Sequence, residues 1–369
     1  MTLCLIACKQ RSKSVEGIFV DMDNPEKVSL FDIFHSIEII PLETSPDVLI
    51  AGIGKIIVYQ DSYFMLDPRQ NIIFIFDHSG KYLSKIDKKG KGPGEYLSIA
   101  DIFFNPFSNN LELLEPHGFI HVFDINDNYI ETKRIVYPDF RAVHLFTIVD
   151  YNTYVFYQQF ESTKIIYFDL DENKLLQKEF EENSRLGSYG VKSIYQFKDD
   201  LFFFRPIHPV VYKIGKNRLE AVFQFDFGKY TREGTTAIFS EEAINNWAKY
   251  KEEVFNQFPY VITKLMHNNK YVFASLLWKN ASRKANIIYN KSTEKSKFIL
   301  DFIERVEFNS DNITIPIITD DYILISCQWI DLEKYIKIDM LNGKQKEIFE
   351  KVTQAKMEQN PILIKYWFK

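Results

Sequence analysis

The segment 75–83, which reads IFDHSGKYL, decides the fold because its pattern recurs five more times. An apolar pair is followed by a polar residue, a turn and a second apolar run. Asp and Asn side chains bond nearby backbone groups and Gly tolerates positive φ, so this pattern is typical of a β-hairpin. The other copies are VFDINDNYI (122–130), YFDLDENKL (167–175), VYKIGKNRL (211–219), IYNKSTEKS (288–296) and KIDMLNGKQ (337–345).

The copies are regularly spaced along the chain. Their second positions are Phe76, Phe123, Phe168, Tyr212, Tyr289 and Ile338, at intervals of 47, 45, 44, 77 and 49 residues. Each copy is preceded by a short apolar run, such as YFMLDP (63–68), and further runs lie upstream and downstream. Four short strands in a repeat of about 40 to 50 residues are the signature of a β-propeller blade.

The sequence therefore predicts an all-β fold, a six-bladed β-propeller with four antiparallel strands per blade in a single domain over 36–369. We expect the blades at about 54–87, 98–135, 142–180, 190–227, 259–303 and 312–350. The strands 37–43 and 362–368 are both candidates to complete a terminal blade and seal its edge. We expect 9–35 to be a linker or tether.

The long interval between the fourth and fifth copies predicts a helical insertion at 239–256. Ser240 is a suitable N-cap and is followed by acidic residues, which favour a helix N-terminus. Its apolar residues recur at helical spacing. We expect this helix on the rim between blades four and five, and a functional lid is the alternative.

The glycine-rich stretch KGKGPGEY (89–96) raises the question of a phosphate-binding loop. It lacks the Lys-Ser/Thr ending and spacing of a Walker loop, and Pro93 and the following strand-like run do not suit a dinucleotide-binding turn. In the repeat it falls between the last strand of blade one and the first strand of blade two. We interpret it as a structural crossing that its glycines allow.

The element GKGPGEY, after FDHSGKYLSKI and IIPLETSPDVLIAGIGKI, resembles the six-bladed β-propeller lipoproteins of Gram-negative anaerobes. The closing NPILIKYWFK (360–369) is similar to the C-terminal strand of that family. The resemblance covers nearly the whole chain. It implies a propeller in the cell envelope and a domain of unknown function, without a defined activity.

The N-terminus MTLCLIACKQRSK resembles a lipobox, in which Cys8 would become the lipidated first residue once the residues before it are removed, and we interpret 1–8 as a truncated lipoprotein signal remnant. Only seven residues precede Cys8 and no basic segment is present, so we expect the natural start to lie upstream or the chain to be trimmed. No apolar run of about 18 residues follows that would span a membrane. We expect a lipid-anchored protein on the periplasmic or outer-membrane side of a Gram-negative envelope.

Composition excludes several classes of protein. The hydrophobic fraction of 46% supports a sizeable core, the aromatic fraction of 16% favours strands, and the net charge of -5 leaves no basic footprint for nucleic acid. Of three cysteines, Cys327 lies in an apolar strand-like run and suits a buried position. No disulfide or metal spacing is present, and we expect no cofactor.

The outer-to-inner crossings and the loops between second and third strands of a propeller emerge on one face. We expect that face to bind a ligand. Its candidate residues are Lys91, Glu95, Tyr96, Arg205, His208, Trp278 and Trp329, joined by Arg69, His117 and Gln159.

Trp278 and Trp329 each follow the Tyr of their own repeat by seven residues, so we expect equivalent positions in adjacent blades. Two neighbouring indoles could stack on a sugar ring or a peptide side chain. The alternative is that both fill gaps between blades.

The remaining polar candidates give weaker signals. Arg205 and His208 lie in a proline-bracketed loop and could bind an anion, or form structural contacts instead. His117 and His121 lack a third ligand for a metal. We assign no catalytic residues.

Three functions remain open. The first is a non-catalytic binding or scaffold module for a glycan, peptide or protein partner. The second is a lactonase-like hydrolase with calcium in the central channel, but only Asp101 offers a carboxylate near the starts of the inner strands, and calcium takes six to eight oxygen ligands. The third is a structural subunit of an envelope complex.

Overall fold

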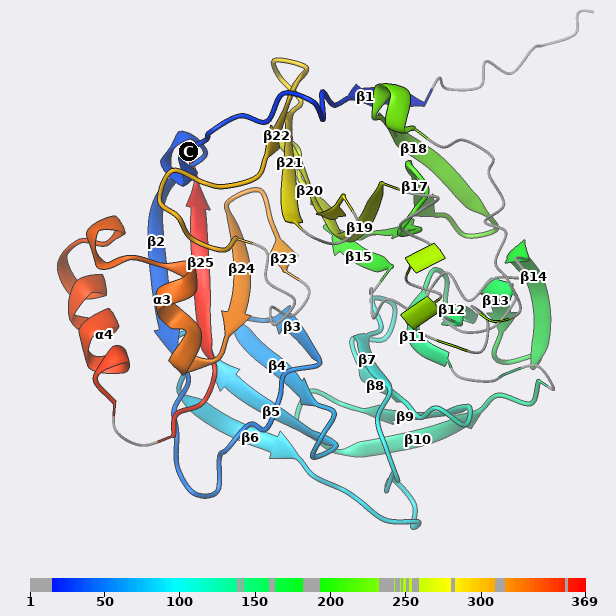
Figure 1. Ribbon diagram of the computed structural model, residues 1–369. Coiled ribbons are helices and arrows are strands. Elements are labelled where there is room, and N and C mark those ends of the chain that lie inside the picture. Colours follow the sequence, from blue (N-terminus) through cyan, green and yellow to red (C-terminus); the bar gives the residue numbers. More distant parts are fainter. Residues whose placement is uncertain are drawn as a thin grey trace, which may run out of the picture.

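The structure is a computed structural model. It describes residues 15–137, 140, 143–158, 163–181, 193–231, 242, 246, 248–249, 252–253, 259–279, 283–308, 316–355 and 358–369. Six sheets are arranged in a ring, which confirms the predicted six-bladed β-propeller (Figure 1).

The first three blades each contain four consecutive antiparallel strands. Blade one consists of β3 (Lys55–Tyr59), β4 (Ser62–Asp67), β5 (Ile72–Asp77) and β6 (Tyr82–Ile86). Blade two consists of β7 (Asp101–Phe104), β8 (Leu111–Leu114), β9 (Phe119–Phe123) and β10 (Tyr129–Arg134). Blade three consists of β11 (Val143–Ile148), β12 (Thr153–Gln158), β13 (Thr163–Asp169) and β14 (Lys174–Glu181).

Blades four and five follow the same order, and the chain start adds a fifth strand to blade four. Blade four consists of β15 (Ile194–Phe197), β16 (Asp200–Phe204), β17 (Val210–Ile214), β18 (Leu219–Asp226) and the parallel outer strand β1 (Glu16–Phe19). Blade five consists of β19 (Tyr260–His267), β20 (Tyr271–Trp278), β21 (Arg283–Asn290) and β22 (Lys295–Ile299).

Blade six joins the two ends of the chain. From the inside outwards it consists of β23 (Ile317–Ile318), β24 (Tyr322–Cys327), β25 (Ile362–Phe368) and β2 (Phe34–Pro41). Figure 1 shows β2 and β25 side by side, and their pairing runs from Phe34↔Phe368 to Pro41↔Ile362. Both strands that were candidates for ring closure therefore take part in it.

The predicted extent of blade six, 312–350, is wrong in its second half. The expected hairpin at 337–345 is helical, since η4 (Ile338–Met340) and the start of α4 (Gly343–Thr353) occupy it. Ile348, Phe349 and Val352 follow at helical spacing, and Phe349 and Val352 are buried. The short elements η3 (Trp329–Asp331) and α3 (Leu332–Tyr335) precede them.

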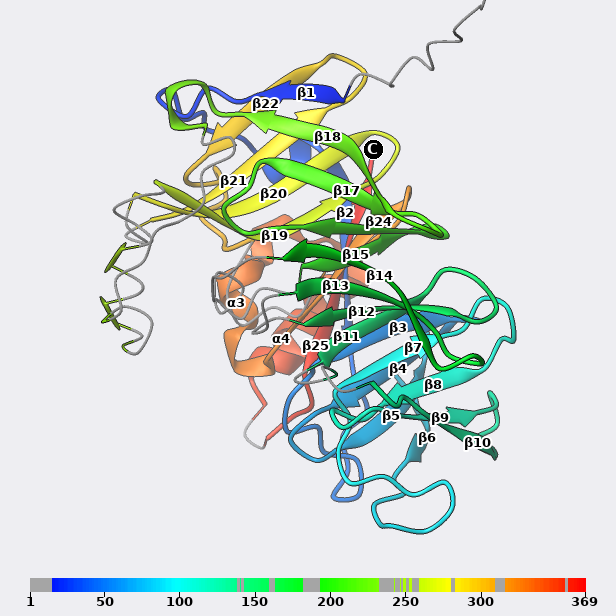
Figure 2. The same cartoon turned by 90° about the vertical axis from the view of Figure 1, so that its right-hand side faces the viewer.

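The predicted linker 9–35 is also corrected for its described part. Residues 16–33, here called the N-terminal belt, lie along the outer edges of blades four and five (Figure 2). The belt buries the side chains of Ile18, Val20 and Val28, which holds it to the sheets. The belt includes η1 (Leu30–Asp32) and leads directly into β2.

The connections between second and third strands, and those between blades, emerge on one face of the ring. Figure 2 shows α3 and α4 together on that side. The short element η2 (Gly228–Tyr230) begins the connection between blades four and five. The helical insertion predicted at 239–256 lies largely outside the described residues.

Candidate functional site

The loop 89–96 is a crossing between β6 and β7 whose polar groups contact each other. The hydroxyl of the fully buried Tyr96 donates a hydrogen bond to the carbonyl of Ile86 at 3.0 Å. The amide of Gly92 donates to the Glu95 carboxylate at 2.8 Å. Lys91 is exposed. Of the three predicted ligand-binding residues in this loop, Tyr96 therefore has no surface to offer a ligand.

The same loop is held against the outer strand of blade two. Gly94 has φ +75°, and a Cβ there would lie 2.6 Å from the Tyr129 ring. Lys88 forms an ion pair of 3.0 Å with Asp127. The glycine thus allows both a left-handed backbone and a close approach, which agrees with a structural crossing.

Arg69 and His117 lie in the connections between second and third strands of blades one and two. Arg69 donates to the carbonyl of Ala51 at 3.0 Å, and His117 is exposed. His121 is buried and contacts Glu115 at 3.1 Å. No metal-binding group of three or more His, Cys, Asp and Glu side chains occurs among the described residues. Gln159 lies outside them.

Arg205 and His208 share a tight turn, in which the His208 amide donates to the Arg205 carbonyl at 3.1 Å. Burial, together with the charge of Arg205, lowers the pKa of His208 to about 3. Burial also lowers the pKa of Arg205 to about 10, against the opposing effect of Tyr212. The guanidinium lies 4.4 Å from the ring centre of Phe180. His208 is therefore neutral near pH 7.

The two tryptophans do not form a common surface. Trp278 is only 2% exposed and contacts the rings of Tyr230 and Phe298, with centres 5.1 and 5.6 Å away. Because β20 continues to Trp278, this residue still pairs within the sheet, whereas β24 ends before Trp329. Trp329 lies in η3, partly buried against the core. Trp278 therefore fills a gap inside the fold.

The inner strands carry a buried carboxylate that already has partners. Asp101, at the start of β7, accepts a bond from the Lys55 ammonium at 2.8 Å. Its other oxygen accepts the amide of Phe146 on β11 at 3.1 Å. Asp101 thus links the inner strands of three blades.

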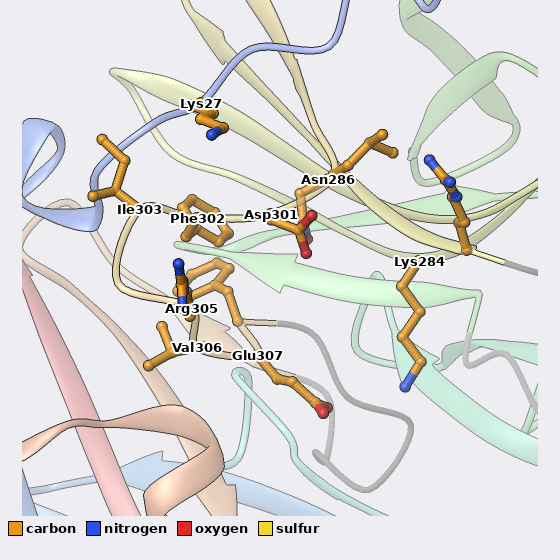
Figure 3. A pocket seen from close by; sticks show the side chains of 12 residues that line it. Lys27, Lys284, Asn286, Asp301, Phe302, Ile303, Arg305, Val306 and Glu307 are labelled. Carbon is orange, nitrogen blue, oxygen red and sulfur yellow. The ribbon is translucent and has the colours of Figure 1, made fainter.

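A hollow of about 850 Å³ lies at blade five, beside the N-terminal belt. It is here called the blade-five pocket, and its volume suits a small ligand. Figure 3 shows Lys27 from the belt on one side, Lys284 from β21 on the other and Asp301 between them. Its lining residues are Lys27, Arg283, Lys284, Asn286, Leu300, Asp301, Phe302, Ile303, Arg305, Val306, Glu307 and Phe308.

Three segments build this pocket. Pairing of β21 with β22 begins at Asn286↔Ile299, so the start of β21 projects past the end of β22. The segment 300–308 then leaves the sheet, and buried Phe302 and Phe308 anchor it. The belt binds the same segment, since the Ile303 amide donates to the Val28 carbonyl at 2.9 Å.

A second contact fixes the belt at this point. The Glu304 carboxylate accepts the amide of Leu30 at 3.0 Å and also bonds the hydroxyl of Ser29. The loop that forms one wall of the pocket and the belt that carries Lys27 are therefore held together.

The pocket is basic in a chain whose net charge is -5. Its four basic side chains outnumber its two acidic ones. In the described part of the chain, Lys27, Arg283 and Arg305 take part in none of the ion pairs. Ile303 adds apolar surface, being 59% exposed. The arrangement can hold an anionic group beside an apolar surface.

Sequence reasoning missed this pocket. The adjacent Arg283 and Lys284 at a connection between second and third strands were the available signal, on the face that was expected to bind. Lys27 gave no signal, because the belt was interpreted as a linker. The segment 300–308 was assigned to the end of a blade and the crossing after it.

The fold and this pocket define a six-bladed β-propeller with a basic hollow at its rim. The chain belongs to the family described as domain of unknown function DUF4934, whose model matches residues 16–366. No curated protein matches the chain in sequence. Within the described residues, no helix is long and apolar enough to cross a bilayer.

Two solved structures share the fold. One, from Bacteroides fragilis NCTC 9343, is of a protein described as exported; it has a TM-score of 0.72 and 17% identity, over 96% of this chain and 99% of that one. The other is a member of the DUF4221 family from Bacteroides vulgatus ATCC 8482, with a TM-score of 0.56 and 10% identity, over 91% and 97% of the two chains.

Proposed function

We propose that this chain is a non-catalytic binding module of the cell envelope, for a glycan, peptide or protein partner, and that the blade-five pocket holds its ligand. The pocket carries the proposal. It combines four basic side chains, an apolar surface and a volume suited to a small ligand, and three of the four, Lys27, Arg283 and Arg305, form no ion pair among the described residues.

The envelope location has two supports. Cys8 lies in a lipobox-like sequence, and a structural relative is described as exported. We propose a lipid anchor at Cys8, with the propeller outside the cytoplasm. Metabolic labelling with a clickable fatty acid, in wild type and Cys8→Ser, tests it. Labelling of Cys8→Ser at the wild-type level would contradict this anchor.

A thermal-shift screen of the chain lacking residues 1–8 tests the binding function. The panel contains glycans, peptidoglycan fragments, peptides and divalent metals. A ligand that binds only the folded state raises the melting temperature by mass action. We expect a shift that disappears in Arg283→Gln. A panel without any shift at about millimolar ligand contradicts binding of a small ligand and favours a scaffold role.

The hydrolase alternative places calcium at Asp101 in the channel. Both oxygens of Asp101 already accept hydrogen bonds, from Lys55 and from the amide of Phe146. This observation favours the binding module. A calcium titration with micromolar affinity that is lost in Asp101→Ala would reverse that preference.

A further inference from the structure

We infer that the blade-five pocket takes an acidic saccharide, a sugar with at least two carboxylate or sulfate groups. The inference rests on the proposed binding function and adds the chemical class of the ligand. Its first support is the excess of two basic side chains in the pocket. Arginine binds planar acid groups through paired hydrogen bonds, so Arg283 and Arg305 suit such groups.

The two acidic side chains of the pocket limit which classes of ligand it can hold. Asp301 and Glu307 line the same hollow, and both are exposed. Their carboxylates only accept hydrogen bonds and repel a bare inorganic anion. A ligand that approaches them carries hydrogen-bond donors as well as acid groups. Sugar hydroxyl groups supply such donors in large number.

The remaining lining suits the rest of a sugar ring. Asn286 is half-buried; its side-chain oxygen accepts the Ser275 hydroxyl at 3.2 Å, and its amide nitrogen is a donor. Ile303 is exposed, and Val306 lies on the same segment. An apolar surface of this kind can cover the C–H groups of a sugar.

The backbone at Arg305 is left-handed, as it is at other described non-glycine residues such as Lys198 and Glu294, and this conformation allows a test. Arg305 has φ +55°, and its amide closes a turn on the Phe302 carbonyl at 3.0 Å. A left-handed backbone disfavours side chains that carry a Cβ, and glycine would fit there without that cost. The turn keeps an arginine at the pocket where stability alone favours glycine.

Calorimetric titration of the chain lacking residues 1–8 tests the inference. The probes are trigalacturonate, a disulfated disaccharide, neutral maltotriose, hexaglutamate and sodium sulfate. We expect one or both acidic sugars to bind, with an affinity that falls as salt is raised, and maltotriose, hexaglutamate and sulfate to bind far more weakly. The two acidic arms distinguish carboxylate from sulfate.

Three variants locate the site. Arg283→Gln and Arg305→Gly should each weaken binding about tenfold or more, the loss expected for a charge-assisted hydrogen bond. Arg305→Gly should keep its melting temperature, because glycine suits the left-handed backbone. Arg218→Gln removes the same charge from an exposed hairpin on the opposite face and should leave binding unchanged.

The outcomes separate this inference from the proposed function. If maltotriose binds as tightly as the acidic sugars, or hexaglutamate binds more tightly than they do, the ligand is not an acidic saccharide. If an acidic sugar binds Arg283→Gln and Arg305→Gly as tightly as it binds wild type, its binding site is not the blade-five pocket. If neither acidic sugar binds while another probe does, the proposed class of ligand is wrong, but the proposed binding function is still supported. If neither these probes nor the ligands of the thermal-shift screen bind, both the acidic saccharide and the binding of a small ligand in the pocket are contradicted.

Discussion

The ammonium of Lys55 lies 2.8 Å from the carboxylate of Asp101, and only 2% of the Asp101 side chain is exposed. We expect Asp101→Ala to lower the free energy of unfolding by about 3 kcal/mol, because it leaves the Lys55 charge and the Phe146 amide without their partner. Urea unfolding measures this loss. In the exposed pair of Lys213 and Asp200, the matched Asp200→Ala should cost less than about 1 kcal/mol. Equal losses would contradict the linking role of Asp101.

Glu112 predicts a pH dependence of stability. It is fully buried, accepts bonds from Tyr154 at 2.8 and 2.9 Å and from Asn105 at 2.8 Å, and burial raises its pKa above 4.5. The folded state thus holds the proton more tightly than the unfolded state. The stabilising contribution is complete below the unfolded-state pKa and is lost as pH rises through the folded-state pKa.

Glu112→Gln removes this titration while keeping the shape of the side chain. We expect the free energy of unfolding of wild type, relative to the variant, to fall as the pH is raised from about 4.5. Urea unfolding at a series of pH values measures the difference. If wild type instead gained stability relative to Glu112→Gln over this range, burial would not be the main influence on the pKa of Glu112.

Asn360 should be critical for ring closure. It is 2% exposed; its side-chain amide donates to the carbonyls of Glu43 and Val48, both at 2.7 Å, and its oxygen accepts the Ile50 amide at 2.8 Å. We expect Asn360→Ala to lower the free energy of unfolding by about 3 kcal/mol, since three backbone groups, two of them in buried hydrogen bonds, lose their partner.

Thermal and urea unfolding measure the effect. Asn128→Ala, which removes an exposed amide bonded to Asp124, should change stability by less than about 1 kcal/mol. Deletion of 360–369 should lower the melting temperature far more than Asn360→Ala, because it removes β25 from the middle of blade six. An unchanged melting temperature after the deletion would contradict the observed closure.

Trp278→Ala should affect stability. The buried indole contacts Tyr230 and Phe298, so its removal should cost about 3 to 5 kcal/mol. Trp329 occupies the equivalent position of the next repeat and is half-buried, so Trp329→Ala should lower the free energy of unfolding by less. Where Trp278→Ala folds, at reduced temperature, we expect its ligand affinity to equal that of wild type. If folded Trp278→Ala does not bind the ligand, Trp278 contributes to ligand binding as well as to packing.

The predictable part of the fold was the part encoded locally. In blades one to five, each apolar run and its turn form strands with their neighbours in sequence, so the repeat revealed them. In blade six, β25 and β2 come from opposite ends of the chain, so they were candidates for ring closure only as terminal strands outside the repeat. The mispredicted part of this blade was the hairpin expected at 337–345. The segment 337–345 shared turn residues with the repeat, but the apolar spacing after it was helical.

The binding face was only partly predictable. Connection order indicated which loops gather on it, but not which side chains remain exposed. Tyr96 and Trp278 looked like ligand contacts because aromatic residues serve both binding and packing, and burial decided between the two. The blade-five pocket needs Lys27, Arg283 and Arg305 from three segments, and only the three-dimensional arrangement of the belt brings them together.

Blade six combines strands from both ends of the chain, which affects when the ring can close during folding. β2 precedes the first blade in the chain, yet its partner β25 follows the fifth, and so does Gln345, whose side chain accepts the Ile39 amide at 2.7 Å. Contacts between such distant segments form slowly. The first five blades can form their sheets before β25 is made, whereas β2 has no strand to pair with in blade six until then. We therefore expect ring closure to come late in folding, with β2 exposed to strand-to-strand aggregation before it.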